Sequence, residues 1–382
     1  MRIGLNLIGF TPGCGGVETY LTSLIAALQK VDHDNEYILL CDEVAASAFV
    51  PVSDRFRIHI FRYQQQSFRW FMRGIFQRTL GYDILKRDLL HLPVDVMHHT
   101  LTVLNPPGLP YPSVLTFHDM QQEYFPQFFS SQELAKRRES YLPSVIESKA
   151  LIALSLHAKT CLVEKYGIDP LKIHVIHSGC GEDCRERDPG TLVDLIQRYN
   201  LQQPFIIYPA ATWPHKNHSR LLKALRLLVE RRLFEGELLL TGAQKEAHGE
   251  MKAEIASLGL TDKVRWLGYI PRSDLLCLYN LARFMVFPSL FEGFGLPVVE
   301  AMASGCPVAC SHTTSLPEIA GDAAIYFDPM SVEDMAGVIG TLWSDSSLQK
   351  LHIKLGVERS TMFRWEEAAA KTVTVYRQAL TG

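Results

Sequence analysis

The sequence contains no apolar run of about eighteen residues, which is the length that a membrane-spanning helix requires. It also shows no signal peptide, because Met1 and Arg2 lead directly into an apolar, strand-like run at residues 3–8. These two absences argue against an integral membrane protein and against a secreted protein. We therefore expect a cytoplasmic protein.

An excess of charge of one sign is missing as well. The 38 lysines and arginines are balanced by 41 aspartates and glutamates, which leaves a net charge of −3. A chain with this balance has no overall electrostatic attraction for nucleic acid. We expect no nucleic-acid partner.

The eight cysteines form no C-x-x-C pair and lie scattered through apolar or loop positions. We expect them to be reduced thiols, as is usual in cytosolic proteins. Cys180 and Cys184 lie near His174 and His177, but their spacing does not match a zinc knuckle. We therefore predict no metal site.

The length and the pattern of the chain predict two α/β domains. A chain of 382 residues is too long for one ordinary core, and its 47% hydrophobic and 21% charged content is typical of a soluble globular protein. Alternating strands and helices indicate parallel, doubly wound sheets. The expected strands lie at 2–8, 37–41, 94–98, 113–117, 151–154, 172–176, 205–209, 237–240, 264–268 and 283–287. Residues 177–189 break the alternation and are the candidate linker.

Residues 55–87 carry a local excess of positive charge. Eight arginines and lysines (55, 57, 62, 69, 73, 78, 86 and 87) face only Asp83. Within this stretch, residues 67–80 show the spacing of a basic amphipathic helix with aromatic residues on its apolar face. Such a helix suits peripheral contact with an anionic membrane, here the inner face of the plasma membrane. The alternative, which we favour slightly, is a helix packed on its own domain with a basic outer face.

Residues 287–305, FPSLFEGFGLPVVEAMASG, combine the end of a strand, a turn and the start of a helix. Gly293 and Gly295 remove two side chains where the turn meets the helix, and Pro297 suits the first helical turn. The backbone N–H groups left there suit a phosphate or sugar hydroxyls.

Two carboxylates accompany these donors. Glu300 lies in the first helical turns and leans back toward the turn, while Glu292 stands at its mouth. Because carboxylates only accept hydrogen bonds, the pair suits a ligand rich in hydroxyls, with one glutamate on a ribose and the other on a hexose.

Three other loops carry candidate ligand-binding residues. His118 and Asp119 follow the strand at 113–117, where an open α/β sheet faces its ligand, although a core histidine and a capping aspartate are the structural alternative. Lys216 precedes a helix and could neutralise a diphosphate, or could simply be exposed. The glycine-rich turn at 13–18 suits an anion.

Two familiar motifs are incomplete or misplaced. The dinucleotide fingerprint G-x-G-x-x-G would need a glycine at position 18, which is Glu18, so we discount an NAD site. Residues 32–34, Asp-His-Asp, have the form of a metal-binding D-x-D motif. They lie in a polar break far from any glycine-rich loop, and we expect a solvated loop there.

The segment PSLFEGFGLPVVEAMASGCPV, with Glu292-x7-Glu300, closely resembles the signature of retaining GT-B glycosyltransferases. That family, glycosyltransferase family 4, includes sucrose synthase and many bacterial mannosyl- and glucosyltransferases. The resemblance implies two Rossmann-like domains of doubly wound parallel sheet that face a cleft. It places an acceptor-side domain at 1–180, a nucleotide-sugar domain at 181–362, and a final helix at 363–382 that returns to the first domain.

The resemblance also implies roles for individual residues. His118, Glu292 and Lys216 would be catalytic, with His118 and Glu292 on the sugar and Lys216 on the diphosphate. Many members carry an arginine where this chain has Ala210, and His215 would partly replace it. The remaining donor-binding residues implied by the resemblance are Gly15, Gly16, Asp119, Tyr269, Ile270, Phe294, Gly295, Leu296 and Glu300, with Tyr269 and Ile270 on the nucleobase and Glu300 on the ribose.

The activity implied is transfer of a glucose- or mannose-type hexose from a UDP- or GDP-sugar to a hydroxyl of a glycan or lipid-linked acceptor in polysaccharide biosynthesis. The configuration would be retained through front-face attack, with no metal and no cofactor other than the nucleotide sugar. Two alternatives stay open. One is a non-catalytic GT-B partner subunit, and the other is a further GT-B activity, such as a sugar-nucleotide epimerase or a phosphorylase.

Overall fold

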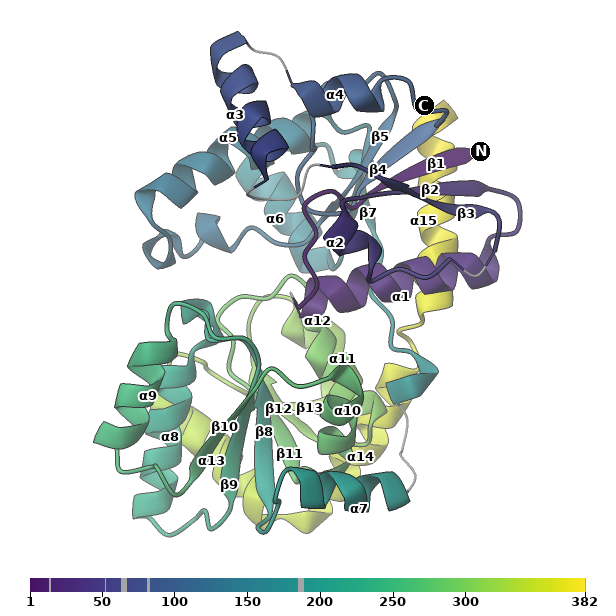
Figure 1. Ribbon diagram of the computed structural model, residues 1–382. Helices are drawn as coiled ribbons and strands as arrows, with labels where there is room; N and C mark the ends of the chain where they lie inside the picture. The colour runs from purple at the N-terminus through teal and green to yellow at the C-terminus, as the bar shows by residue number, and fades with distance from the viewer. Residues whose placement is uncertain (14, 52, 63–66, 81–82, 185–188, 382) are drawn as a thin grey trace. The chain divides into compact units, whose positions relative to one another are not determined.

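The computed structural model describes residues 1–13, 15–51, 53–62, 67–80, 83–184 and 189–381 (Figure 1). The chain divides into two units. The first unit contains Met1–Ser178 and Trp365–Gly382, and the second contains Gly179–Arg364. Each unit is built on one parallel sheet covered by helices.

The first sheet has seven strands in the order β3-β2-β1-β4-β5-β6-β7, and every neighbouring pair is parallel. Its central strands are buried on both faces, which is why they read as apolar runs in the sequence. The strand order reverses direction between β1 and β4. The strands are β1 Arg2–Asn6, β2 Glu36–Cys41, β3 Phe56–Ile60, β4 Val96–His99, β5 Ser113–Phe117, β6 Ala150–Ala153 and β7 Ile173–Val175.

Helices of the first unit begin and end at recognisable signals. Ser130 and Glu133 form a capping box at the start of α5, and Gly167 ends α6 in the left-handed conformation. The helices are α1 Gly16–Val31, α2 Glu43–Ala46, α3 Phe68–Leu80, α4 Ile84–Leu89, α5 Ser131–Glu147, α6 Leu156–Tyr166 and α15 Trp365–Thr381. Short 3-10 turns lie at η1 Gln121–Glu123, η2 Pro126–Phe128 and η3 Pro170–Lys172.

Helix α15 is the last element of the chain, yet it packs in the first unit alongside α1 (Figure 1). The ring of Trp365 lies 5.7 Å from that of Tyr20 on α1. The hydroxyl of Tyr376 lies 2.7 Å from Nδ1 of His98 on β4. Residues at the two ends of the sequence therefore share one core.

The second sheet has six parallel strands in the order β10-β9-β8-β11-β12-β13, with its reversal between β8 and β11. The strands are β8 Phe205–Pro209, β9 Glu237–Thr241, β10 Val264–Gly268, β11 Phe284–Phe287, β12 Val308–Ser311 and β13 Ala324–Phe327. The helices are α7 Pro189–Arg198, α8 His218–Glu230, α9 His248–Ser257, α10 Arg272–Leu281, α11 Leu296–Ala303, α12 Leu316–Ala320, α13 Val332–Ser344 and α14 Ser346–Ser360, with 3-10 turns at η4 Glu182–Cys184, η5 Pro214–Lys216 and η6 Gly321–Ala323. The predicted pair of doubly wound, Rossmann-like sheets is confirmed.

Helix α3 is oriented differently from the arrangement that we favoured. Its aromatic residues are exposed, with Phe68 at 77% and Phe71 at 58%. Arg73 instead points inward, where its guanidinium bonds both carboxylate oxygens of Asp83 at 2.7–2.8 Å and Oδ1 of Asn105 at 2.7 Å. The expectation of a buried apolar face with a basic outer face is therefore wrong, because the helix is anchored through Arg73.

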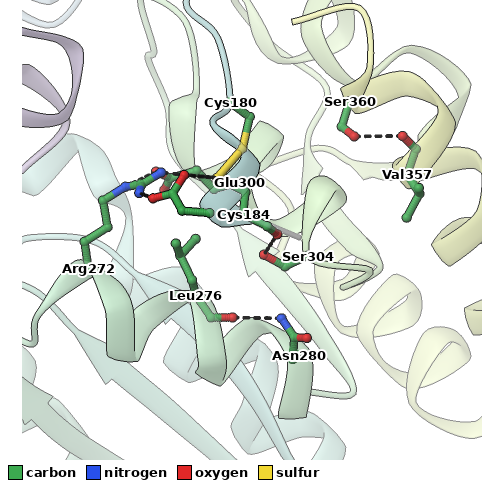
Figure 2. Close-up of a disulfide and its surroundings, with 10 residues drawn as sticks. Cys180, Cys184, Arg272, Leu276, Asn280, Glu300, Ser304, Val357 and Ser360 are labelled. Atoms are coloured by element: carbon green, nitrogen blue, oxygen red, sulfur yellow. Dashed lines mark hydrogen bonds and ion pairs between the residues drawn. A yellow bond between two sulfur atoms is a disulfide. The ribbon is translucent and has the colours of Figure 1, made fainter. Parts of the chain in front are cut away.

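The expectation of reduced thiols is wrong for one pair of cysteines. Cys180 and Cys184 form a disulfide in the second unit (Figure 2). The turn η4 brings them together, since Cys180 N–H donates to Phe363 O at 2.9 Å and Ser304 Oγ donates to Cys184 O at 2.7 Å. Cys14 lies outside the described residues, and the remaining cysteines are buried thiols that form no disulfide with a described residue, namely Cys41, Cys161, Cys277, Cys306 and Cys310.

Within the described ranges, no helix combines the length and the apolar content needed to cross a bilayer.

Gly242 provides a test of how tightly the second sheet is packed at its carboxyl edge. It follows β9 with φ +131°, and a Cβ there would lie 2.6 Å from the carbonyl carbon of Ala210. We expect Gly242→Ala to lower the melting temperature by roughly 5 °C or more, because neither backbone can yield without strain. Gly249→Ala, on an open face of α9, is the matched control and should leave it unchanged or raise it slightly. Equal melting temperatures for both variants would contradict this packing.

Candidate active site

The site is built on the two loops that leave β8 and β11, the strands between which the second sheet reverses its order. Their backbones are joined, since Leu290 N–H donates to His215 O at 2.8 Å and the Asn217 side chain donates to Pro288 O at 3.0 Å. The buried Tyr208 hydroxyl donates to Lys216 O at 2.6 Å. These bonds hold the two loops against each other at the carboxyl edge of the sheet, where open α/β sheets bind ligands.

Lys216 and Glu292 meet between these loops. The Nζ of Lys216 lies 2.5 Å from Oε1 of Glu292, and the two side chains are 17% and 13% exposed. The ammonium also lies 5.7 Å from the ring of Phe287. His215 is buried beside Lys216 in η5. The structure therefore brings two of the predicted catalytic residues into direct contact.

The side chains of Thr314 and Ser315 hydrogen-bond the backbone of the turn between Glu292 and α11. Glu292 N–H donates to Thr314 Oγ1 at 3.2 Å. Ser315 Oγ donates to the carbonyl of Glu292 at 3.0 Å and to that of Phe294 at 2.9 Å. With these bonds made, the carbonyls of the turn face the protein interior.

Gly295 is the residue that lets the helix start here. Its φ of +100° is left-handed, and an added Cβ would lie 2.7 Å from Leu316 Cδ2. Leu296 begins α11, with Pro297 next, and Phe294 packs edge-on against Phe363 at 5.9 Å. The first turn of α11 thus begins directly after the Glu292 turn, and its N–H groups stay the predicted donors.

Glu300 lies on α11 with only 4% of its surface exposed. Arg272, the first residue of α10, places its Nε and Nη2 both 2.9 Å from Oε1 of Glu300 (Figure 2). Arg272 also contacts Asp183 and lies 3.2 Å from Cys184 Sγ. Both contacts of the arginine with Glu300 use Oε1, and no described residue donates a hydrogen bond to Oε2 of Glu300. One carboxylate oxygen is thereby left for a ligand.

Burial raises the pKa of Glu300, and the charge and hydrogen bonds of Arg272 counteract part of this rise. Burial acts against the charge of Arg272 as well, but Glu300 and Asp183 together raise its pKa. Arg272 was not among the binding residues predicted from the sequence. The available signal was that a buried glutamate requires a cation, and that an arginine follows the loop at 268–271.

Tyr269 and Ile270 lie between β10 and α10, directly before Arg272. Tyr269 is 58% exposed, whereas Ile270 is buried at 7%. The loop that precedes Arg272 therefore exposes the ring of Tyr269 to solvent and buries the side chain of Ile270.

His118 and Asp119 follow β5 in the first unit. Nε2 of His118 donates to Thr100 O at 2.8 Å, so the neutral ring carries its hydrogen there, and the ring meets Tyr20 edge-on at 5.2 Å. Burial lowers the pKa of His118, and the bond to Thr100 offsets this only in part. Asp119 Oδ1 accepts the N–H of Gln121 at 3.4 Å, although Met120 rather than Asp119 is the N-cap of η1.

The glycine-rich turn at 13–18 is bridged by the side chain of Glu18. Gly13 N–H donates to Oε2 of Glu18 at 2.7 Å, and Gly15 precedes α1, which begins at Gly16. A Cβ built on Gly15 or on Gly16 would have nothing within 4 Å. The surface beside these two glycines is therefore open.

The D-x-D sequence at 32–34 is only partly solvated. His33 and Asp34 are exposed, but Asp32 is buried and accepts bonds from the Tyr37 hydroxyl at 2.5 Å and from Asn35 Nδ2 at 2.7 Å. The expectation of a solvated loop is wrong for Asp32, whose carboxylate also accepts the backbone N–H groups of Asp34 and Asn35 in the turn that follows α1. In the part of the chain that the structure describes, no group of three or more His, Cys, Asp or Glu residues could hold a metal ion.

Comparisons with known proteins show the family of the chain. The family model for "Glycosyl transferases group 1" matches residues 196–356, and the model for "Glycosyltransferase Family 4" matches residues 14–182. The chain is 30% identical to the O-antigen chain mannosyltransferase B of Escherichia coli, over 69% of this chain and 70% of that protein. It is 30% identical to the MMP α-(1→4)-mannosyltransferase of Mycolicibacterium hassiacum, over 66% of this chain and 58% of that protein.

A solved structure shows the same fold. The sucrose-phosphate synthase of Thermosynechococcus elongatus superposes with a TM-score of 0.79 at 20% identity, over 99% of this chain and 98% of that one.

The Arg272–Glu300 pair predicts how stability depends on pH. A carboxylate whose pKa is raised by folding stabilises least at high pH, because the unfolded chain ionises first. Arg272→Met removes the cation that limits this rise, so stability should fall more steeply between pH 5 and pH 8 than in the unsubstituted protein. At pH 8 we expect a loss on the order of 3 kcal/mol, measured by urea denaturation.

Arg226→Met is the control, because Arg226 pairs with Glu230 at the exposed surface of α8. It should change stability by less than about 1 kcal/mol at either pH. Parallel pH profiles for Arg272→Met and the unsubstituted protein would contradict the assignment.

Proposed function

Because the chain belongs to the group 1 and family 4 glycosyltransferases, we propose that it transfers a mannose-type hexose from a UDP- or GDP-sugar to a glycan hydroxyl, with retention of configuration. The names of the two relatives described above support mannose. The observation that carries the proposal is the Lys216–Glu292 pair at the reversal of the second sheet.

Lys216 and Glu292 would exchange partners when the donor binds. A diphosphate offers the lysine a stronger negative charge than one carboxylate does, and the cation would then stabilise the phosphate as it leaves the sugar. Glu292, released from Lys216, would accept hydrogen bonds from sugar hydroxyls. The amino terminus of α11 adds N–H donors beside the same turn, so neutralisation of the leaving group requires no metal in this proposal.

Glu300 would hold the ribose without giving up Arg272. Both contacts of Arg272 with Glu300 use Oε1, so Oε2 remains available to accept from a ribose hydroxyl. Tyr269 and Ile270, just before Arg272, would contact the nucleobase. Arg272 is then a positioning residue that keeps the buried Glu300 charged and correctly oriented.

Retention would follow from attack on the same face that the phosphate leaves. In this scheme the acceptor oxygen bonds to the anomeric carbon as the carbon–phosphate oxygen bond breaks, and the leaving phosphate takes the acceptor proton. His118, neutral because burial lowers its pKa, would contact the sugar rather than carry charge.

Transfer itself is tested with a panel of GDP-mannose, UDP-glucose and related donors, with para-nitrophenyl α-mannoside as acceptor. We expect one donor to release its nucleoside diphosphate only when acceptor is present, and the α-linked product to be visible by NMR. Lys216→Met and Glu292→Gln should each lower kcat by about 100-fold. Lys223→Met, which removes an exposed pairing with Glu254, should not.

The results also separate the alternatives. Inactivity of the unsubstituted protein with every donor would favour a non-catalytic partner subunit. Conversion of the nucleotide sugar without acceptor would favour an epimerase. A product with inverted anomeric configuration would contradict the retaining mechanism but not the transferase activity.

We also propose that α3 places the enzyme on an anionic membrane surface, where a lipid-linked acceptor would lie. Phe68, Phe71 and Trp70 are exposed at 77%, 58% and 46%, and the exposed Arg62 and Arg69 lie close to them in sequence. Aromatic residues beside cations suit the interface of a bilayer that contains acidic lipids.

Vesicle sedimentation tests this contact. We expect the protein to bind vesicles that contain phosphatidylglycerol and to bind phosphatidylcholine vesicles weakly, with binding reduced by salt. Phe68→Ser/Phe71→Ser should weaken binding at least tenfold, because two aromatic side chains no longer enter the interface. Val50→Ser/Leu171→Ser removes equally exposed apolar residues elsewhere and should have no effect. Unchanged binding by the phenylalanine variant would contradict the proposal.

A further inference from the structure

The Cys180–Cys184 disulfide lies next to the ion pair that carries Glu300 (Figure 2). Nη2 of Arg272, which lies 2.9 Å from Oε1 of Glu300, also lies 3.2 Å from Sγ of Cys184. Asp183, the residue before Cys184, forms a further ion pair with Nη1 of Arg272. The turn that the disulfide closes therefore supplies two partners of the arginine.

Arg272 contacts Glu300 through one carboxylate oxygen only. Its Nε and Nη2 both lie 2.9 Å from Oε1. An arginine and a carboxylate frequently pair as a fork instead, with one N–H group on each oxygen. Here Nη1 is engaged by Asp183 and Nη2 is shared with Cys184, so the turn holds the guanidinium away from the fork. Oε2 of the buried glutamate stays open as a result.

The ends of this turn have anchors besides the disulfide. Cys180 N–H donates to Phe363 O at 2.9 Å, and Ser304 Oγ donates to Cys184 O at 2.7 Å. Asp183 lies between these ends, and its side chain is 50% exposed. Breaking the S–S bond would leave both ends anchored, but it would remove the covalent closure that fixes Asp183 between them.

The two cysteines of the disulfide differ in exposure. Cys184 is fully buried, whereas Cys180 is half-buried. Thiol–disulfide exchange begins with attack of a thiolate on an accessible sulfur, and it is faster when the other sulfur leaves easily. The N–H of Arg272 at 3.2 Å from Cys184 Sγ would stabilise negative charge on that sulfur as it leaves. The pair therefore suits attack at Cys180 with Cys184 as the leaving group.

We propose that Cys180–Cys184 is a thiol–disulfide exchange site that controls binding of the nucleotide sugar, with the oxidised form keeping Oε2 of Glu300 open. The inference rests on the proposed transferase function and adds its regulation. When the pair is reduced, the turn relaxes and Asp183 releases Arg272. The guanidinium then forks onto both oxygens of Glu300, and Oε2 no longer accepts a ribose hydroxyl.

The reductant that this exchange requires is a dithiol. One of its thiolates bonds to Cys180 Sγ as the S–S bond breaks, and the electron pair of that bond leaves on Cys184 Sγ. The second thiolate then displaces Cys180, so the dithiol becomes a cyclic disulfide and the protein gains two electrons. Because Asp183 and Glu300 disfavour a lasting negative charge beside them, Cys184 takes up a proton. The protons that the dithiol loses reach the protein thiols through solvent, and an oxidised dithiol reverses the exchange.

The exchange is tested first, on the full chain purified without reductant. The folded protein is equilibrated with mixtures of reduced and oxidised dithiothreitol, quenched with acid, and alkylated with iodoacetamide in urea. We expect mass spectrometry to show Cys180 and Cys184 converting together, while the far-UV circular dichroism of the protein stays unchanged. A disulfide that resists dithiothreitol in the folded protein, at concentrations that reduce it in urea, would overturn the proposal.

The effect on binding is measured by calorimetry with UDP and GDP. We expect the nucleotide that binds the oxidised protein to bind the reduced protein about tenfold more weakly, because one hydrogen bond to a charged group is lost. With the matching donor, KM should rise by a similar factor while kcat changes less than about twofold, because the ribose contact is the same in the ground and transition states. Equal affinities in the two redox states would overturn the proposal.

Two variants locate the effect. Asp183→Asn, in the oxidised protein, should weaken nucleotide binding as reduction does, because a neutral amide holds Arg272 less strongly. Asp262→Asn, at an exposed aspartate of the same unit, is the matched control and should bind like the unsubstituted protein. Cys180→Ser retains every other cysteine and should bind weakly with or without dithiothreitol. A response of Cys180→Ser to dithiothreitol would place the effect at another cysteine and contradict the assignment.

The outcomes separate this inference from the proposed function. If a nucleotide binds both redox states alike, the function stands and the inference fails. If neither UDP nor GDP binds in either state and no donor is transferred, the proposed function fails. Thiol trapping then still decides whether Cys180 and Cys184 exchange.

Discussion

The reversal of strand order within a parallel sheet is the constraint on which the candidate active site depends. Where neighbouring strands connect in opposite directions, their following loops separate and leave room at the carboxyl edge. In the second sheet this brings Lys216 and Glu292 to 2.5 Å although 76 residues separate them in the sequence. The arrangement does not depend on residues that are adjacent in the chain.

The charged residues of the candidate active site form two ion pairs in the absence of a ligand. Lys216 has Glu292, and the buried Glu300 has Arg272. Burying a carboxylate without a cationic partner would be costly, so each pair lowers the cost of burying its carboxylate in the folded site. The two pairs have different consequences. Lys216 and Glu292 are partly exposed and can exchange partners, whereas Arg272 leaves one oxygen of a buried glutamate available.

Much of this fold and part of the site could be predicted from sequence. Alternating apolar strands and helices indicate doubly wound sheets, and the turn at 287–305 carries its glycines and glutamates in one local pattern. Strand β3 was missed because FRIHI lies in a basic stretch whose charges obscure its alternation. Arg272 was missed because its partners Asp183 and Glu300 are set by tertiary packing. The Cys180–Cys184 bond was missed although the two cysteines are only four residues apart, because the cysteine pattern of the chain indicated reduced thiols. The exposed face of α3 could not be foreseen, since spacing shows that a face is apolar but not which face the protein covers.

The most direct test of this account is a crystal structure of the protein with the donor that proves active, or with its nucleoside diphosphate. The account predicts a diphosphate within hydrogen-bonding distance of Lys216 Nζ, with the contact between Lys216 and Glu292 broken, and a ribose hydroxyl on Oε2 of Glu300 while Arg272 remains on Oε1. A nucleotide bound at the carboxyl edge of the first sheet, or a diphosphate that leaves the Lys216–Glu292 pair intact, would contradict it.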